Sequence, residues 1–243
     1  MPYPIHHGLP DFLGEEMAHG SDAAARRLQR LDRSMGWLAR LYETRLWYPL
    51  VITIYGGVGA LSFKQLIQEC TTVIAPISGR VLDAACGPGT YGRRVASSTC
   101  QVFGVDISTG MLRQGMRYVQ QEHNPHIRFA RARVEALPFR DTFFDGVLCC
   151  GSLHLFADPP GALREISRSL KPGAPLVVFT FTQGKTGLLK YSAVRQRLHN
   201  GRLMKVFSPD ELERMFQAAG FSQFCSKVYG SILVFSAQRE DLH

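Results

Sequence analysis

A glycine-rich turn with acidic residues on both sides is the part of the sequence best suited to bind a cofactor. The segment from Val81 to Gly92 reads VLDAACGPGTYG. Backbone N–H groups at such a strand–turn–helix junction can approach a ligand closely. Gly87, Gly89 and Gly92 also satisfy the G-x-G-x-x-G fingerprint of dinucleotide binding, and Asp106 stands 19 residues after Gly87, where an acid that binds a ribose is expected. Two classes of cofactor are therefore compatible with this turn.

The charge of Asp83 favours one of these two classes. A dinucleotide would bring a doubly negative pyrophosphate to the turn, which a carboxylate would repel. S-adenosylmethionine instead brings a sulfonium and an ammonium group, and Asp106 could accept hydrogen bonds from its ribose hydroxyls. We therefore expect S-adenosyl-L-methionine as the cofactor and S-adenosyl-L-homocysteine as its product. A nicotinamide oxidoreductase is the alternative.

Short apolar runs alternate with helix-length segments after Pro76. The pattern predicts strands at 80–85, 101–106, 127–130, 144–150 and 176–182, with helices near 91–97, 111–121 and 160–170. Such alternation implies right-handed crossovers and a mainly parallel sheet with helices on both faces. The expected fold is therefore α/β, a doubly wound, mostly parallel, Rossmann-like sheet of seven strands. Its ligands should lie at the carboxyl ends of the strands.

The C-terminal part predicts one more helix and an antiparallel strand. Ser208 to Glu211 forms a capping box, so a helix should run from there to about Ala219. The apolar runs 223–229 and 232–237 meet at Gly230-Ser231, which indicates a hairpin. The polar and basic stretch 183–207 is interpreted as an insertion over the active site.

The N-terminal part is expected to form a separate helical cap. Residues 1–20 read as a flexible lead-in, and residues 21–76 as an N-terminal helical cap or lid. Helical spacing runs from Ser21 to Trp47, residues 48–59 interrupt it with a proline and three glycines, and Ser62 caps a second helix. Residues 77–243 would then form the main domain.

Four motifs in order resemble those of a known family. VLDAACGPGTYGRRVA, VFGVDISTGML, VEALPFRDTFFDGVLC and LREISRSLKPGAPLVVFTF are similar to successive motifs of class I S-adenosylmethionine-dependent methyltransferases. They look most like the small-molecule group, methyltransferase type 11, which includes enzymes of ubiquinone and menaquinone biosynthesis. The resemblance implies methyl transfer to an O, C or N atom of a small, fairly hydrophobic metabolite. Quinone precursors, phenols and polyketide-like natural products are the expected acceptors.

The resemblance also implies roles for individual residues. The cofactor-binding positions would be Tyr42, Asp83, Ala85, Gly87, Gly89, Asp106, Ile107, Met111, Val134, Glu135 and Cys150. Arg133 stands where an acid of the family usually accepts the adenine amino group, so we expect the backbone of Val134 to make that contact.

Methyl transfer needs alignment and exclusion of water, and a base only where the acceptor loses a proton. His154 follows the fourth predicted strand and is the candidate catalytic base; its alternative role is to cap or pack a turn. Trp47, Tyr48 and Tyr55, together with His154, are expected to line the substrate pocket, and ordinary helix packing is the alternative for the three aromatic residues.

Charge and composition leave two further alternatives open. The net charge is +8, which could suit an RNA or protein methyltransferase, but the arginines are spread along the chain, so no nucleic-acid partner is expected. Arg133 leaves open a cofactor-binding protein of this fold with lost or non-methylating activity.

The cysteine and histidine spacing predicts neither disulfides nor a metal site. The six cysteines make no C-x-x-C pair and no signal peptide is recognisable, so we expect a cytoplasmic protein with reduced thiols. The apolar stretch 46–61 is shorter than the roughly 20 residues that a membrane span requires, although peripheral membrane contact is compatible with it. The sequence predicts no oligomeric state.

Overall fold

The computed structural model describes most of the chain. The described residues are 4–6, 8–13, 32, 39, 44, 47–57, 61–183, 187–200 and 204–241.

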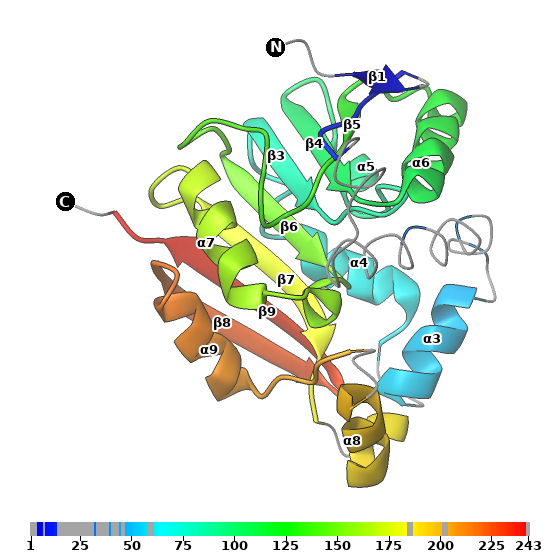
Figure 1. Ribbon diagram of the computed structural model, residues 1–243, viewed down its shortest axis with the longest axis vertical. Helices are drawn as coiled ribbons and strands as arrows, with labels where there is room; N and C mark the ends of the chain where they lie inside the picture. Colours follow the sequence, from blue (N-terminus) through cyan, green and yellow to red (C-terminus); the bar gives the residue numbers. More distant parts are fainter. Residues whose placement is uncertain are drawn as a thin grey trace.

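A seven-stranded sheet forms the centre of the molecule (Figure 1). Its strands are β3 (Gly79–Ala84), β4 (Cys100–Asp106), β5 (Ile127–Arg131), β6 (Gly146–Cys150), β7 (Pro175–Phe181), β8 (Phe221–Tyr229) and β9 (Ile232–Arg239). The strand order is β5-β4-β3-β6-β7-β9-β8. The first five strands are parallel, and β9 runs antiparallel between β7 and β8. The predicted α/β class, the mostly parallel sheet and the antiparallel C-terminal strand are confirmed.

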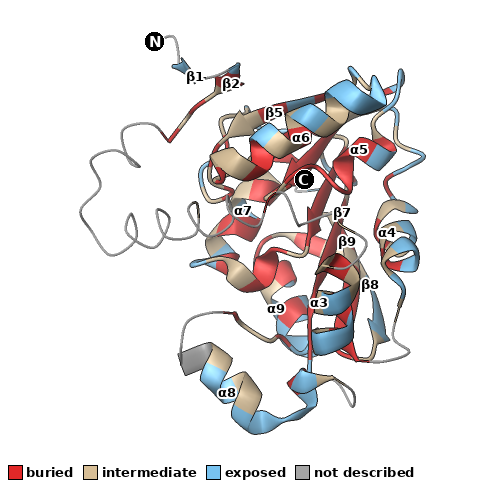
Figure 2. Cartoon of the chain, turned by 90° about the vertical axis from the view of Figure 1, so that its right-hand side faces the viewer, coloured by how far each residue is buried: buried red, intermediate tan, exposed pale blue. Residues whose placement is uncertain are grey.

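Helices cover both faces of this sheet because the strand residues alternate in direction. One face packs Leu82 and Val147 against α7 (Pro159–Ser169) and α9 (Pro209–Gln217). The other face packs Val81 and Leu148 against α3 (Trp47–Gly56), α4 (Phe63–Thr71), α5 (Gly92–Val95) and α6 (Thr109–Glu122). Figure 2 shows the buried residues concentrated in the layer between these helices and the sheet.

Side-chain caps begin four of the described helices, two of them at Ser62 and Ser208 as the sequence predicts. Ser62 and Gln65 form a reciprocal capping box at α4, and Ser208 accepts the backbone N–H of Glu211 at 3.1 Å to begin α9. Ser108 and Asp158 cap α6 and α7 in the same way. The helix after the glycine-rich turn is shorter than predicted, since α5 ends at Val95.

The interruption predicted at residues 48–59 is wrong for most of that stretch. Residues 47–56 form α3, with Pro49 as the third residue of the helix. A proline in the first turn breaks no intrahelical hydrogen bond, because the first N–H groups of a helix have no partner within it. Gly56 ends the helix.

The N-terminal residues that the structure describes are ordered against the sheet, where a flexible lead-in was expected. The strands β1 (Ile5–His6) and β2 (Leu9–Pro10) form a small hairpin, and Asp11 bridges to Arg131, the last residue of β5. The predicted helix from Ser21 to Trp47 lies almost wholly outside the described residues. Within 183–207 the structure has a 3-10 turn, η2 (Leu188–Lys190), and α8 (Ser192–Asn200).

Candidate active site

Asp83 is a buried carboxylate in the strand that leads into the glycine-rich turn. Only 1% of its surface is exposed, and its Oδ2 accepts the backbone N–H of Gly92 at 2.9 Å. The pKa of Asp83 is raised to about 7: burial is the largest cause and the nearby charge of Asp106 adds to it, while the hydrogen bond from Gly92 partly offsets them. The side chain thus links β3 to α5. It also provides a carboxylate whose negative charge is not fully neutralised by its neighbours.

The turn itself takes left-handed backbone conformations. Ala85, Gly87 and Gly89 have φ values of 52°, 55° and 75°. A Cβ on Gly89 would lie 2.9 Å from the ring of Phe129, whereas a Cβ on Gly87 would meet no atom within 4 Å. The backbone at Gly87 therefore borders open space where a ligand could approach.

Asp106, the last residue of β4, joins two strand ends. Its Oδ2 accepts the N–H of Gly87 at 2.8 Å and its Oδ1 accepts the N–H of Ser108 at 2.8 Å. Burial raises its pKa as well. Each carboxylate oxygen can accept more than one hydrogen bond, so the group can still accept ribose hydroxyls.

These two carboxylates fit S-adenosylmethionine better than a dinucleotide. Asp83 is buried and Asp106 is half-buried at the same edge of the sheet, and desolvation is the largest cause of their raised pKa values. A ligand with a positive centre lowers the cost of two neighbouring buried acids, while a pyrophosphate would increase it. The acidic set at this turn thus suits a cationic ligand with hydroxyl groups.

The residues expected around adenine lie between β4 and α6, on α6, and on the loop after β5. Met111 and Val134 are buried, with 2% and 4% of their surface exposed, and the backbone oxygen of Ile107 accepts Nε of Arg131 at 3.0 Å. Arg133 Nε lies 3.8 Å from Oε2 of Glu135, so the arginine at the family's acidic position pairs with the glutamate two residues later.

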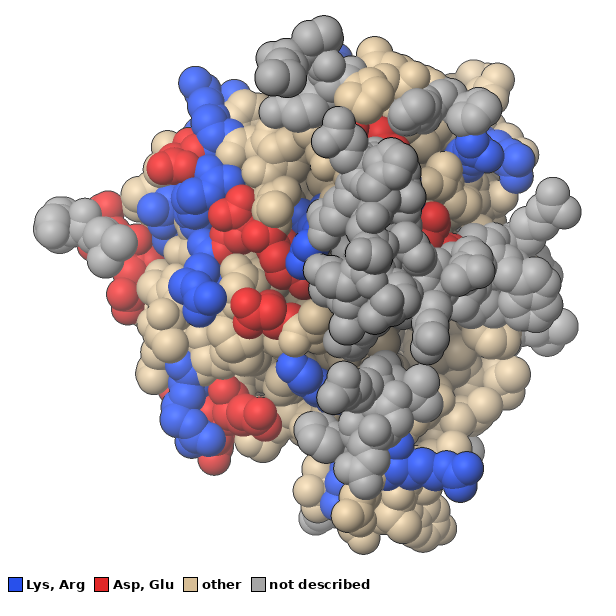
Figure 3. All heavy atoms as spheres, viewed as in Figure 1, with Lys and Arg blue, Asp and Glu red and all other residues tan. Residues whose placement is uncertain are grey.

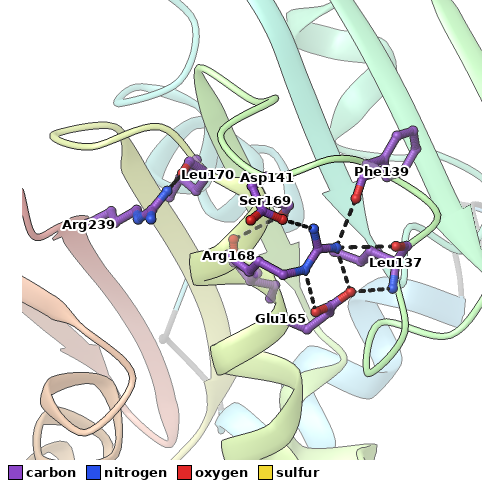
Figure 4. A network of polar contacts seen from close by, with 9 residues as sticks. Leu137, Phe139, Asp141, Glu165, Arg168, Ser169, Leu170 and Arg239 are labelled. Carbon is purple, nitrogen blue, oxygen red and sulfur yellow. Dashed lines mark hydrogen bonds and ion pairs between the residues drawn. The ribbon is translucent and has the colours of Figure 1, made fainter. Parts of the chain in front are cut away.

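A polar network fixes the loop that carries Val134 and Glu135 (Figure 4). Arg168 on α7 donates to the backbone oxygen of Phe139 at 2.9 Å and pairs with Glu165 at 2.7 Å and with Asp141 at 2.5 Å. Glu165 in turn accepts the N–H of Leu137 at 2.8 Å. The loop is therefore held against α7 through Leu137, Phe139 and Asp141.

Three residues near this site were missed by the sequence analysis. Arg131 pairs with Asp11 at 3.0 Å and with Asp32 at 3.1 Å, and Asp32 also accepts the N–H of Thr109 at 3.1 Å. The charge of Asp32 contributes to the raised pKa of Asp106. No local signal identifies these contacts, since their partners are 77 to 120 residues apart.

Apart from the glycine-rich turn, a hollow of about 90 Å³ lies where α3 meets the ends of β6 and β7. It is lined by Trp47, Tyr48, Val51, Ile52, Gly151, His154, Phe179 and Phe181. The structure thus brings together Trp47, Tyr48 and His154 from the expected substrate pocket. Tyr55 does not line the hollow but packs its ring 5.7 Å from that of Phe181, and Tyr42 lies outside the described residues.

Two tyrosines connect this hollow to the glycine-rich turn. The hydroxyl of Tyr48 lies 3.3 Å from the hydroxyl of Tyr91, which directly precedes Gly92. A Cβ on Gly151 would lie 3.4 Å from the Tyr48 hydroxyl, so the backbone at Gly151 passes close to this hydroxyl. Cys150, the neighbour of Gly151, is buried, and burial raises its pKa, which keeps it a thiol.

His154 is buried with an uncharged imidazole. Burial lowers its pKa to about 4, and its ring packs edge-on against Phe181 with 5.0 Å between centroids. Nδ1 lies 3.4 Å from the hydroxyl of Thr180. Among the described residues, no three His, Cys, Asp or Glu side chains gather into a possible metal site.

Comparison with known proteins places the chain in a family. Residues 82–178 match the model of a methyltransferase domain. An uncharacterized chloroplastic methyltransferase of Arabidopsis thaliana is 30% identical over 246 residues, covering 94% of this chain and 68% of that protein. The demethylmenaquinone methyltransferase of Clavibacter sepedonicus is 35% identical over 128 residues, covering 52% of this chain and 51% of that enzyme.

A solved structure supports the same fold. Phosphoethanolamine N-methyltransferase 2 of Haemonchus contortus superposes with a TM-score of 0.70 at 17% identity, covering 88% of this chain and 60% of that one.

The chain belongs to the class I S-adenosylmethionine-dependent methyltransferases. The cofactor of this class is S-adenosylmethionine, which decides between the two cofactors that the glycine-rich turn alone left open. The matches cover about half the length of the demethylmenaquinone methyltransferases it resembles. Within the part of the chain that the structure describes, no helix has the length and apolar character of a membrane span.

Proposed function

We propose that the protein transfers a methyl group from S-adenosylmethionine to a small, fairly hydrophobic acceptor of the quinone-precursor or phenol type. The observation that carries this proposal is the aromatic hollow lined by Trp47, Tyr48 and His154, which the Tyr48–Tyr91 contact links to the glycine-rich turn. A mostly apolar wall with a few polar groups is typical of small-molecule sites. Relatives named as demethylmenaquinone and 2-phytyl-1,4-naphtoquinone methyltransferases are consistent with such an acceptor.

Asp83, Asp106 and the glycine-rich turn would hold the cofactor. Asp83 and the backbone of Ala85, Gly87 and Gly89 would face its methionine end, and Asp106 its ribose. The adenine would lie among Ile107, Met111 and Val134, with Glu135 and Cys150 beside the site. When bound, the cofactor supplies an electrophilic methyl group.

The aromatic hollow would bind the acceptor and remove its proton. Its volume of about 90 Å³ suits one small apolar group of an acceptor, and its aromatic walls exclude water around the reacting atom. His154 would accept a proton from a phenolic hydroxyl, and Thr180 at Nδ1 would orient the ring so that Nε2 faces the acceptor. A pKa of about 4 keeps His154 able to accept a proton at neutral pH but makes it a weak base, which suits acidic phenols best.

A cofactor-binding protein without methyl transfer is the second candidate, favoured by one observation. Arg133 replaces the family's acid and pairs with Glu135, so the adenine contact must differ from that of the family pattern. The RNA or protein methyltransferase of the sequence analysis rests on the net charge alone. The cytoplasmic location also stays a prediction, and one relative carries the description chloroplastic.

The test is a methyl-transfer assay with labelled S-adenosylmethionine against a panel of acceptors. We expect labelled product from hydroquinones and acidic phenols, and none from tRNA, total RNA or protein. Transfer to RNA or protein alone would contradict the proposal. Binding of the cofactor without any transfer across the panel would favour the second candidate.

A further inference from the structure

Four large apolar side chains are exposed on two neighbouring elements beside the hollow. Leu50 and Ile54 on α3 are 50% and 36% exposed, and Leu188 and Tyr191 at η2 are 44% and 53% exposed. Leu50 and Ile54 stand four residues apart, so they share one side of α3. Trp47 and Val51 on the same helix line the hollow. The exposed apolar side chains therefore belong to the same helix as residues that line the hollow.

The two elements pack directly against each other. An added Cβ on Gly187, at the start of η2, would lie 2.5 Å from the backbone oxygen of Tyr55 at the end of α3. Arg195 of α8 donates to the backbone oxygens of Leu189 at 2.6 Å and Lys190 at 3.0 Å, which fixes the turn. In Figures 1 and 2, α3 and α8 lie at the same end of the molecule, and α8 projects from it.

The charged residues in the segments that form this surface are all basic. Residues 183–207 contain six Lys or Arg and no Asp or Glu, and residues 46–63 contain no charged residue. Lys190 and Arg197 are exposed. In the view of Figure 3, Lys and Arg atoms are visible over α8, and the visible Asp and Glu atoms lie away from it. We call the surface formed by α3, η2 and α8 the α3–α8 face.

We propose that the α3–α8 face docks on an anionic lipid surface and that the acceptor reaches the hollow from the lipid side. Exposed aliphatic and aromatic side chains next to cations, with no acids among them, are the pattern of protein surfaces that lie in the membrane interface. The route for the acceptor rests on the proposed function, whereas the docking does not.

The expected binding is weak, reversible and sensitive to salt. Among the described residues of this face, two exposed cations and four exposed apolar side chains contribute, and surface potentials fall off within about 10 Å at 0.1 M salt. Removal of one cation should lower the partition coefficient about fivefold. Replacing a half-exposed apolar side chain by a charged one should lower it on the order of tenfold.

Vesicle flotation of the full chain tests the docking. Vesicles of phosphatidylcholine with 30% phosphatidylglycerol should carry the protein upward at low salt, and pure phosphatidylcholine vesicles should carry much less. The variants Leu50→Glu, Tyr191→Glu and Lys190→Gln/Arg197→Gln should each reduce flotation. The matched controls are Val228→Glu on β8, where Val228 is 50% exposed, and Arg113→Gln/Arg117→Gln on α6, and both should float like the parent protein.

Several results would overturn the docking. These are no flotation with either vesicle, equal losses in the control variants, or an α3–α8 variant that changes only the oligomeric mass in light scattering. The last result would assign the face to contacts between copies of the chain.

The acceptor route has its own readout. Variants of the α3–α8 face should slow methylation of an acceptor dissolved in the vesicles and leave that of a water-soluble analogue unchanged. Equal rates on both acceptors would overturn the route. Flotation without methylation of any acceptor would instead refute the proposed function alone, and methylation without flotation would refute the docking alone.

Discussion

The Asp106 carboxylate accepts the backbone N–H of Gly87 at 2.8 Å, which joins the end of β4 to the turn that follows β3. Its other oxygen accepts the N–H of Ser108 at the start of α6. One side chain thus positions the glycine-rich turn and the first turn of a helix, and it still has lone pairs for a ligand. The cofactor site and the local fold therefore depend on the same carboxylate.

Replacing Asp106 by alanine should weaken binding of S-adenosylhomocysteine by about 1–3 kcal/mol, because two ribose hydroxyls would lose a charged acceptor. Titration calorimetry measures the change directly. Asp210→Asn, at an exposed aspartate on α9, is the control and should bind like the parent. A folded Asp106→Ala protein with an unchanged dissociation constant would remove Asp106 from the ribose site.

Asp83 should make cofactor binding depend on pH. Its folded-state pKa is about 7 against an ordinary value of 3.8, so its contribution to stability is fully present below about pH 4 and is lost as pH rises through 7. A cationic ligand prefers the carboxylate, so the affinity for S-adenosylmethionine should rise from pH 6 to pH 8. Below the pKa of Asp83, this affinity should rise by at most about tenfold for each pH unit.

Asp83→Asn is the matched variant for this pH dependence. It removes the titrating group and keeps an oxygen that can accept the N–H of Gly92. Its dissociation constant should change little over the same range. A parent protein whose affinity is constant from pH 6 to pH 8 would show that Asp83 does not sense the ligand's charge.

Ala85 should be strained, and glycine should relieve the strain. A non-glycine residue at φ 52° lowers the free energy of unfolding by roughly 1–2 kcal/mol through backbone strain. Glycine lowers it by about 0.5–1 kcal/mol, because the unfolded chain gains conformational entropy. Ala85→Gly should therefore raise the free energy of unfolding by up to about 1 kcal/mol. Ala84→Gly, one residue earlier in β3 and fully buried, should lower it instead. Chemical denaturation compares the two, and equal losses would argue against strain at Ala85.

Arg131→Ala should release the N-terminal hairpin. The guanidinium holds Asp11, Asp32 and the backbone oxygen of Ile107 at once, which one lysine ammonium could not do. We expect the free energy of unfolding to fall by about 2 kcal/mol and hydrogen exchange at residues 8–13 to become faster. Arg128→Ala changes an exposed arginine of the same strand and is the control. Unchanged exchange in Arg131→Ala would mean that hydrophobic packing alone holds the hairpin.

His154 should make the fold sensitive to acid. Its folded-state pKa of about 4 lies below the ordinary value of 6.5, so stability should be lost as pH falls from about 6.5 to about 4. The loss should be on the order of 1–3 kcal/mol, and His154→Gln should lack it. Urea unfolding at pH 7 and pH 5 measures the difference. Parallel pH profiles for parent and variant would contradict burial of a neutral imidazole.

The same variant separates the two roles of His154. A base contributes about 100-fold or more to turnover, so His154→Gln should lower kcat by that factor while cofactor affinity stays the same. Full activity in a folded variant would leave His154 with the packing role.

The parts of the fold that local sequence controls were predictable. Apolar runs located all five parallel strands, and Ser62 and Ser208 located two helix starts, because these signals act within a few residues. The first strand of the C-terminal hairpin begins two residues earlier than predicted, at Phe221. The register shifts between Ser222 and Cys225, and Gln223 lies there with φ 54°. A bulge of this kind interrupts the apolar alternation on which the prediction depends.

The features that depend on contacts between distant segments of the chain were not predictable from the sequence. Asp83 and Asp106 were found because a motif places them, but the pairing of Arg131 with Asp11 and Asp32 spans about a hundred residues. The hollow forms only when α3 packs beside β6 and β7, whereas the proline and three glycines at 48–59 predict an interruption there. The lowered basicity of His154 likewise follows from burial, which no local pattern reveals.

The central claim is that the turn after β3, with Asp83 and Asp106, binds S-adenosylmethionine. Calorimetric titration of the purified protein with S-adenosylmethionine, S-adenosylhomocysteine and NADH tests it most directly. The structure predicts saturable binding of both adenosyl ligands and none of NADH. Binding of NADH, or no heat from either adenosyl ligand in folded protein, would contradict the account.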